Sequence, residues 1–295
     1  MKIRGLITAM VTPMRDGKVD ELATKRLVNH LIEKGIHGLF ILGTNGEFFS
    51  LSDNEKVNFV QIVVDEVAGR VPVFAGAGCI ATSQVIDLSN KFANLGVDAV
   101  SVITPYLIKL SQSELIEHYT VIANKIKVPM ILYNIPQNTG INIEVTTFEQ
   151  LIKHPNIIGI KDSSGDIKQL EDFIKINDRN DFSVLVGSDS KMLQAFELGA
   201  DGAVSATSNF LTNTDLDIYK SFKEGDRNKA RKLQDSIEPF RKILKYASIP
   251  SVLKYSMSFK GIDVGKPRNP IQDVEPQYFQ EINKILMSYL RKEEI

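Results

Sequence analysis

Cysteine is nearly missing from this chain, because Cys79 is the single one among 295 residues. One thiol allows no disulfide within the chain and no zinc site built from thiolates. The chain also lacks an excess of charge of either sign, since 35 basic and 36 acidic residues leave a formal net charge of -1. That balance gives no electrostatic basis for binding nucleic acid or an anionic membrane. We therefore expect neither of them as a partner.

Long hydrophobic runs are also missing. The first 14 residues hold one apolar patch, which at roughly seven residues is too short to span a bilayer. No small-residue cleavage site follows it, so the segment is not typical of a secretory signal. We expect a cytoplasmic protein in which this patch forms a first strand.

Short apolar runs that alternate with amphipathic stretches are what the chain does contain. Such alternation is typical of an α/β fold with a parallel sheet. Eight units of this kind, at roughly 250 residues, predict a (β/α)8 TIM barrel. An open doubly wound sheet is the alternative, but no Gly-x-Gly-x-x-Gly follows an early strand. The expected strands are residues 5–11, 38–42, 71–76, 98–104, 129–133, 157–160, 183–186 and 202–205.

The last part of the sequence has a different pattern, with helical periodicity and no further strand. Helices are expected at residues 230–246, 251–259 and 274–290, separated by glycine and proline. We therefore predict a catalytic barrel over residues 1–224 and a C-terminal three-helix appendage over residues 225–295.

Functional residues of such barrels lie at the carboxyl ends of the strands. His30, His37, His118 and His154 lie on expected helices or before strands, so a zinc or iron site is not expected. Acidic side chains at strand ends leave magnesium open as an alternative, but we expect no metal and no separate cofactor. The candidate functional residues at the carboxyl ends of the expected strands are Thr12, Thr44, Asn45, Glu47, Tyr106, Tyr133, Asn134, Lys161, Asp162, Ser188, Asp189 and Ser205.

Lys161 is the most unusual of these residues, because it ends the unbroken apolar strand at residues 157–160. Lysine is almost never buried unless it is paired. A free lysine has a pKa of about 10.4, and burial can lower it by roughly 3 to 5 units, which makes the amine a nucleophile. The alternatives are an amine that reaches solvent and a structural ion pair with Asp162.

Tyr133 and the turn that starts at Gly43 carry groups that a lysine nucleophile needs. Schiff-base formation requires a proton relay to expel water, and a phenol oriented by Thr44 can supply it. Backbone N–H groups and hydroxyls of the turn suit the carboxylate of a 2-oxo acid. Two structural alternatives remain open. Tyr133 could only pack at the end of its strand, and the glycines could only serve a tight turn.

Four motifs resemble those of the dihydrodipicolinate synthase/N-acetylneuraminate lyase family. They are Gly43–Glu47, Tyr133–Pro136, Gly159–Lys161 and Gly187–Asp189. The order and spacing fit along the whole chain. The resemblance implies a class I aldolase barrel, usually a homotetramer built as a dimer of dimers. Lys161 would form a Schiff base with pyruvate, Tyr133 would relay protons, and Thr44 with Asn45 would hold the substrate carboxylate. The other substrate-binding residues expected are Tyr106, Asn138, Gly187, Ser188, Asp189 and Ser205.

Three positions depart from the synthase pattern. Asn45 replaces a second threonine, Leu107 stands where a relay tyrosine is usual, and Gln137-Asn138 brings no arginine for an aldehyde carboxylate. Lys109 could partly replace the missing arginine as a positive charge for the aldehyde carboxylate. A neutral pocket favours reversible cleavage of a 4-hydroxy-2-oxo acid, of 2-keto-3-deoxy sugar acid, 4-hydroxy-2-oxoglutarate or sialic acid type, to pyruvate and an aldehyde. The alternatives are the dihydrodipicolinate synthase of lysine biosynthesis and a non-catalytic ligand sensor.

Overall fold

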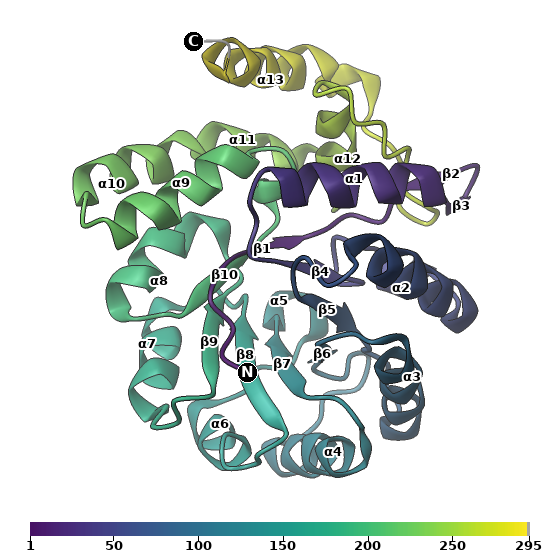
Figure 1. Ribbon diagram of the computed structural model, residues 1–295, viewed down its shortest axis with the longest axis vertical. Helices are drawn as coiled ribbons and strands as arrows, with labels where there is room; N and C mark the ends of the chain where they lie inside the picture. Colours follow the sequence, from purple (N-terminus) through teal and green to yellow (C-terminus); the bar gives the residue numbers. More distant parts are fainter. Residues whose placement is uncertain (294–295) are drawn as a thin grey trace.

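The computed structural model describes residues 1–293 and forms a closed barrel of eight parallel strands. The order around the barrel is β1-β10-β9-β8-β7-β6-β5-β4, and β1 closes it by pairing with both β10 and β4 (Figure 1). The predicted (β/α)8 barrel is confirmed. The strands are β1 Gly5–Ala9, β4 Gly38–Ile41, β5 Val73–Gly76, β6 Ala99–Ile103, β7 Met130–Asn134, β8 Ile157–Asp162, β9 Ser183–Val186 and β10 Gly202–Ser205.

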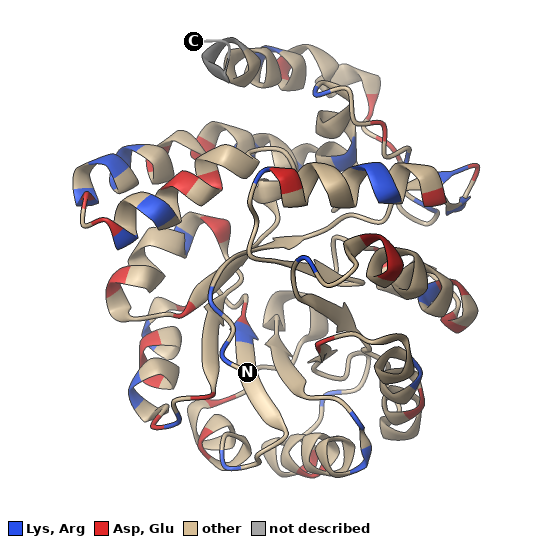
Figure 2. Ribbon diagram, in the orientation of Figure 1, with Lys and Arg blue, Asp and Glu red and all other residues tan. Residues whose placement is uncertain are grey.

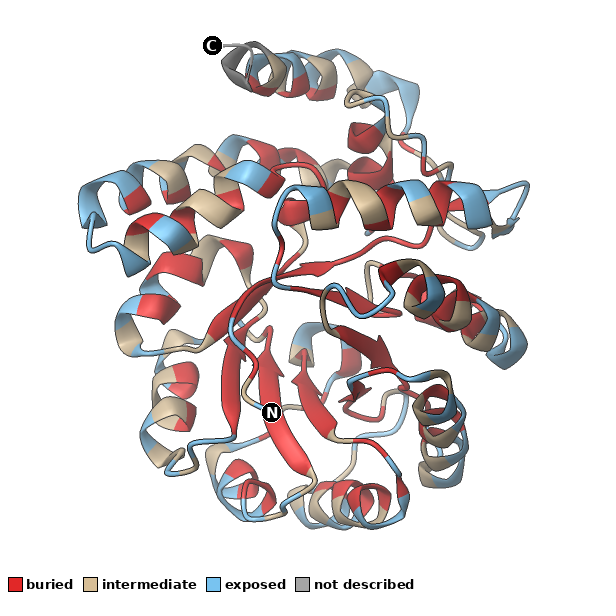
Figure 3. Ribbon diagram, in the orientation of Figure 1, coloured by how far each residue is buried: buried red, intermediate tan, exposed pale blue. Residues whose placement is uncertain are grey.

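Helices surround the barrel and cover its strands on the outside (Figure 1). Every residue of the eight strands is buried, which explains their unbroken apolar sequences (Figure 3). Basic and acidic residues are mixed on the outer helices (Figure 2). The surrounding helices are α1 Glu21–Glu33, α2 Asp53–Val67, α3 Thr82–Leu95, α4 Gln112–Lys125, α6 Val145–Leu151, α7 Ile167–Ile176, α8 Met192–Leu198 and α9 Thr212–Lys223.

A short hairpin and a short helix lie outside the elements predicted from the sequence. Strands β2 Met14–Arg15 and β3 Lys18–Val19 form an antiparallel hairpin after β1. Its turn is Asp16-Gly17, and both residues have a positive φ, as the turn of a two-residue hairpin requires. The other element is helix α5, Pro136–Thr139, which follows β7.

The C-terminal region is helical, as expected, but its first helix is divided. The segment predicted as one helix forms α10 Arg227–Ser236, α11 Glu238–Ile243 and the 3-10 turn η4 Leu244–Tyr246. Pro239 explains the division, because proline fits only in the first turn of a helix. Helices α12 Ser251–Ser258 and α13 Phe279–Glu293 follow, and residues 294–295 of the predicted region lie outside the described residues. No helix within residues 1–293 is long and apolar enough to span a membrane.

Candidate active site

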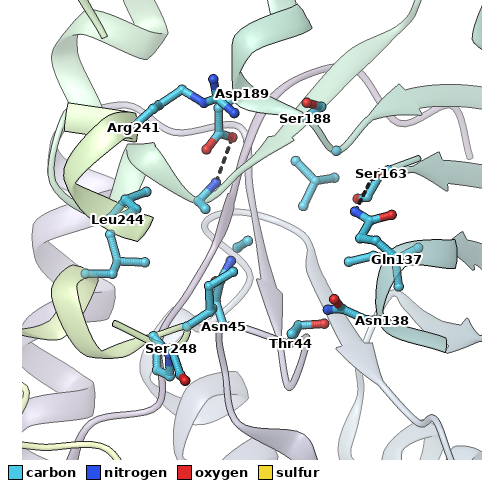
Figure 4. A pocket seen from close by; sticks show the side chains of 18 of the residues that line it. Thr44, Asn45, Gln137, Asn138, Ser163, Ser188, Asp189, Arg241, Leu244 and Ser248 are labelled. Atoms are coloured by element: carbon cyan, nitrogen blue, oxygen red, sulfur yellow. Dashed lines mark hydrogen bonds between the residues drawn. The ribbon is translucent and has the colours of Figure 1, made fainter. Parts of the chain in front are cut away.

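A cavity of about 500 Å³ lies at the carboxyl ends of the barrel strands, under the segment from α11 to α12. Its lining combines residues from the barrel with Arg241, Leu244 and Ser248 from the C-terminal region (Figure 4). Lys245 of the same region also lines the cavity. The sequence-predicted residues among its lining are Thr44, Asn45, Tyr133, Asn138, Lys161, Gly187, Ser188 and Asp189.

Lys161 lines this cavity and is buried, with 4% of its surface exposed. Its Nζ lies 4.2 Å from the centroid of the Phe40 ring and 4.1 Å from that of Tyr133. Burial lowers the pKa of the Lys161 amine to about 7, and the negative charge of Asp189 acts in the opposite direction. The amine is therefore neutral for a large fraction of the time near neutral pH.

Asp162 does not share this environment, although it follows Lys161 directly. Its carboxylate accepts hydrogen bonds from Asn134 Nδ2 and Ser164 Oγ, at 2.8 and 2.7 Å. Successive side chains of a strand point to opposite faces, so Lys161 points into the barrel and Asp162 points outward. These contacts leave no support for an ion pair between the two neighbours.

Gly187, at the end of β9, makes room for the lysine. A Cβ at this position would lie 3.0 Å from Lys161 Cε and only 2.0 Å from Ser163 Oγ. Any larger residue would push against the lysine side chain and the serine. The absence of a side chain at position 187 therefore allows the amine to reach the cavity.

Tyr133 lies beside the lysine because β7 and β8 pair with Tyr133 opposite Lys161. Its hydroxyl lies 3.2 Å from Thr44 Oγ1, within hydrogen-bond distance. Burial raises the pKa of the phenol, while hydrogen bonds with Thr44 and Ser163 oppose that rise. The phenol is thus protonated at neutral pH and connected to a second hydroxyl, which allows it to pass on a proton.

The turn after β4 presents Thr44 and Asn45 to the cavity. Gly46 is needed in it, because a Cβ there would lie 3.0 Å from the backbone nitrogen of Leu42. Glu47, which follows, points away from the cavity and forms a buried ion pair with Lys254 of α12, at 2.5 Å. The turn is therefore fixed by the C-terminal region.

Two of the predicted substrate-binding residues are not among the residues that line the cavity. Ser205 donates to Asp215 of α9 at 2.6 Å, because the alternation along β10 turns its side chain outward. Tyr106 lines a separate hollow with Phe48, Phe49 and other residues. The structure therefore does not bring Tyr106 and Ser205 together with Lys161.

The remaining candidates at the strand ends have structural contacts. Thr12 donates a hydrogen bond to the carbonyl of Gly46 at 2.7 Å. Asp189 lines the cavity, and its carboxylate accepts the backbone N–H groups of Ala206 and Thr207. Glu47, Asp162 and Asp189 are therefore engaged in three different sets of contacts, which does not favour the magnesium alternative.

The carboxylate of Asp189, which lines the cavity, interacts electrostatically with that of Asp215 on α9. Burial raises the pKa of Asp189, and the charge of Arg241 opposes this. Burial and the charge of Asp189 raise the pKa of Asp215 to about 7. Asp215 is thus partly protonated at neutral pH, which lowers the repulsion between the two groups.

Arg241 and Lys245 are lining residues that sequence reasoning missed. They lie on a basic, amphipathic stretch that resembles a solvent-exposed helix face, so no local pattern distinguishes them. Lys109, the cation suggested by the sequence, is not among the lining residues. The cavity is therefore not neutral, contrary to the expectation from Gln137 and Asn138.

A buried lysine whose pKa is lowered to about 7 lies beside a phenol at the end of a (β/α)8 barrel strand. This arrangement is typical of the class I barrel aldolases, which react through a lysine. Residues 2–289 match the model of the dihydrodipicolinate synthetase family, and the chain belongs to that family. It is a lyase of the pyruvate-dependent aldolase type.

Similar proteins cover almost the whole chain. The 4-hydroxy-tetrahydrodipicolinate synthase of Oceanobacillus iheyensis is 34% identical over 290 residues, which are 98% of each chain. The crystal structure of a dihydrodipicolinate synthase from Bacillus anthracis has a TM-score of 0.95 and 34% identity, covering 98% of this chain and 99% of that one. The synthase of Acinetobacter baumannii, solved in complex with pyruvate, has a TM-score of 0.92 and 32% identity, covering 97% and 98%.

Proposed function

We propose that this lyase binds pyruvate as a Schiff base on Lys161 and joins it to an aldehyde, or separates the two. The observation that carries the proposal is the buried Lys161 amine, whose pKa is lowered to about 7 and which lines an open cavity. A charged amine cannot attack a ketone, so an amine that is neutral near pH 7 suits this chemistry.

The reaction begins when the neutral amine of Lys161 attacks C2 of pyruvate and forms a carbinolamine. The Tyr133 hydroxyl donates a proton to the departing hydroxyl group, water leaves, and an iminium remains. The resulting Tyr133 phenolate takes a proton from C3, which gives an enamine. C3 of the enamine attacks the aldehyde carbon, and Tyr133 returns the proton to the aldehyde oxygen. Water then adds to the new iminium and gives a proton to the Tyr133 phenolate, and collapse of the carbinolamine releases the product and restores the Lys161 amine.

The pyruvate carboxylate needs donors at a fixed distance from the lysine. Thr44 and Asn45 line the cavity, and the Thr44 hydroxyl lies beside the Tyr133 hydroxyl. A hydroxyl, an amide and the backbone N–H groups of a glycine-bracketed turn suit a carboxylate. This position would also hold C2 near both Lys161 and the relay phenol.

The first candidate reaction is that of a 4-hydroxy-tetrahydrodipicolinate synthase, in which the aldehyde is aspartate semialdehyde. Curated relatives that are 32% to 38% identical carry this name. Arg241 and Lys245 also give the cavity positive charge, which suits an aldehyde with a carboxylate. The first observation supports the synthase over the cleavage reaction favoured by the sequence, and the second favours an acidic aldehyde over a neutral one.

The second candidate is reversible cleavage of a 4-hydroxy-2-oxo acid, supported by Asn45, Leu107 and Asn138. Leu107 is 86% exposed and has no hydroxyl, so it cannot extend a proton relay. Asn138 lines the cavity where an arginine would be usual by the resemblance. These features weaken the synthase assignment without affecting the Schiff base.

Reductive trapping tests the part that both candidates share. Pyruvate with borohydride should inactivate the protein and add one pyruvate-derived mass at Lys161. Lys161→Met should not be labelled, and a chelator should leave the activity of the unmodified protein unchanged. Labelling at another residue, or no labelling at all, would contradict the proposal.

Substrate profiles then separate the two candidates. We would compare kcat/KM for condensation with aspartate semialdehyde with kcat/KM for cleavage of 4-hydroxy-2-oxoglutarate, 2-keto-3-deoxy acids and sialic acid. A synthase value of about 10⁵ M⁻¹s⁻¹ or more, within the usual range of enzymes, supports the first candidate. A cleavage value at least tenfold higher than the synthase value would support the second.

A further inference from the structure

The cavity has a second positively charged region, separate from Lys161, on the segment from α11 to η4. Arg241 belongs to α11 and Lys245 to η4, and both line the cavity. They are four residues apart along nearly continuous helical structure, so they lie on the same face. Figure 4 shows Arg241 and Leu244 across the cavity from Gln137 and Ser163.

The side of the cavity contributed by α5 offers no cation. Gln137 donates its Nε2 hydrogen bond to the carbonyl of Ser163 at 2.8 Å, and Asn138 beside it is also a neutral amide. The cations that line the cavity within residues 1–293 are Lys161, Arg241 and Lys245. Lys161 is an uncharged enamine when it attacks the aldehyde, so the positive charge available to the aldehyde at that step comes from Arg241 and Lys245.

Arg241 retains donors for a ligand. Its Nη1 donates to both carboxylate oxygens of Glu238, at 3.0 and 3.2 Å, and 27% of its side chain is exposed. A guanidinium carries five N–H donors, so one such contact does not use them all. Its charge also acts on Asp189, whose oxygens already accept two backbone N–H groups.

Lys245 is exposed, and no ion pair to it occurs in the part of the chain that the structure describes. Its amine can turn toward the cavity at little cost, because an exposed lysine remains hydrated and mobile. An arginine held by Glu238 and a mobile lysine together provide one oriented and one adaptable positive group.

We infer that Arg241 and Lys245 form the subsite that binds an acidic group at the far end of the aldehyde. The inference rests on the proposed function, since it assigns the second substrate of the Lys161 reaction. A cavity of about 500 Å³ lies within the usual range for small-molecule sites, roughly 300 to 1,000 Å³. It has room for pyruvate at Lys161 and for a short aldehyde acid that extends to the α11–η4 segment. Carboxylate and phosphate share the required chemistry.

The test compares aldehydes that differ in charge, using pyruvate as the common partner. The probes are aspartate semialdehyde, glyceraldehyde 3-phosphate and neutral glyceraldehyde, and consumption of pyruvate is measured. Losing one charged contact should lower kcat/KM for the acidic aldehydes by roughly tenfold to hundredfold. The neutral aldehyde should change by less than about twofold.

Lys245→Met is the main variant, because Lys245 is exposed and its replacement should leave folding intact. Arg241→Gln removes the oriented charge, and Arg241→Lys should restore part of the preference for acidic aldehydes. Lys242→Met is the matched control, since Lys242 is exposed and is not a lining residue. The control should behave as the unmodified protein does with all three aldehydes.

Trapping of pyruvate at Lys161 distinguishes a failure of the proposed subsite from a failure of the proposed Schiff-base chemistry. All variants should still be labelled by pyruvate and borohydride, because the subsite lies outside the Schiff-base position. Normal labelling together with equal losses for acidic and neutral aldehydes would overturn the subsite and leave the proposed function intact. Failure of the unmodified protein to be labelled would overturn the proposed function and the subsite with it.

The two acidic probes also distinguish the source of the negative charge. A loss confined to aspartate semialdehyde assigns the subsite to a carboxylate, and a loss confined to glyceraldehyde 3-phosphate assigns it to a phosphate. Either result supports an acidic subsite. If Lys245→Met and Arg241→Gln leave the ratio of acidic to neutral kcat/KM unchanged, the subsite is refuted.

Discussion

The lowered pKa of Lys161 predicts how fast pyruvate is captured at each pH. The second-order rate of Schiff-base formation should follow the neutral fraction of the amine in the free enzyme. With a pKa of about 7, roughly half of the amine is neutral at pH 7. An ordinary lysine would be neutral in only about one molecule in 2,500. The buried environment thus supplies about 10³ times more of the reactive form.

The shape of the pH–rate profile distinguishes a lysine of lowered pKa from an ordinary lysine better than the absolute rate does. Between about pH 6 and about pH 8, the neutral fraction of a group with a pKa near 7 rises roughly tenfold and then levels off. For an ordinary lysine, the same interval gives a rise of about 100-fold with no plateau. The assay is the rate of inactivation by pyruvate and cyanoborohydride, with the label at Lys161 measured by mass spectrometry.

A variant at Asp189 tests the cause of the pKa. The charge of Asp189 raises the pKa of Lys161 against the effect of burial. Asp189→Asn removes that charge, so the midpoint of the profile should move to lower pH. Ser188→Ala, an uncharged change in the same lining, should leave the midpoint in place. A midpoint above about pH 9, or a shift to higher pH in Asp189→Asn, would refute the reasoning.

Three other predictions concern the relay, the C-terminal region and assembly. Tyr133→Phe should lower turnover by roughly 10²- to 10⁴-fold with little change in melting temperature, and near-normal turnover would return Tyr133 to a packing role. Lys254→Met should destabilise the fold by about 3 to 5 kcal/mol in urea unfolding, because it leaves Glu47 buried without its partner. Combining Lys254→Met with Glu47→Gln should recover part of that loss. If the losses of the two single variants simply add in the double variant, the ion pair between Glu47 and Lys254 does not contribute. We propose that the exposed Leu107 loop contacts a second copy, so light scattering should show an oligomer that Leu107→Glu makes smaller, and an unmodified monomer would exclude this.

The barrel could be predicted because its strands are buried on both faces and their sequences contain almost no polar interruption. The Asp16-Gly17 hairpin has a recognised turn signal, but its strands of two residues are too short for any periodicity. The division of α10 from α11 depends on Pro239, whose effect was masked by the amphipathic pattern on both sides. Short elements and helix breaks were therefore the parts of the fold that periodicity did not show.

The rule that functional groups follow barrel strands found Thr44, Tyr133 and Lys161, which the structure brings into one cavity. The same rule included Ser205, whose side chain points outward because of the strand's alternation. A position at the end of a strand places a residue near the cavity. Because successive side chains point to opposite faces of the sheet, a shift of one residue decides whether the side chain points into the barrel or outward. Arg241 reaches the cavity only through the packing of the C-terminal helices, which no local pattern encodes.

The C-terminal region does more than cover one end of the barrel. Lys254 reaches the turn that carries Thr44 and Asn45 through its buried ion pair with Glu47. The backbone N–H of Arg268 donates to the other Glu47 oxygen at 2.8 Å. In our proposal, that turn holds pyruvate, and the α11–η4 segment holds the aldehyde. Because Glu47 links the turn to α12, a shift of the C-terminal helices against the barrel would move both substrate positions relative to Lys161, which belongs to β8. The distance between the two reacting carbons would then depend on the packing of the C-terminal region as much as on the barrel.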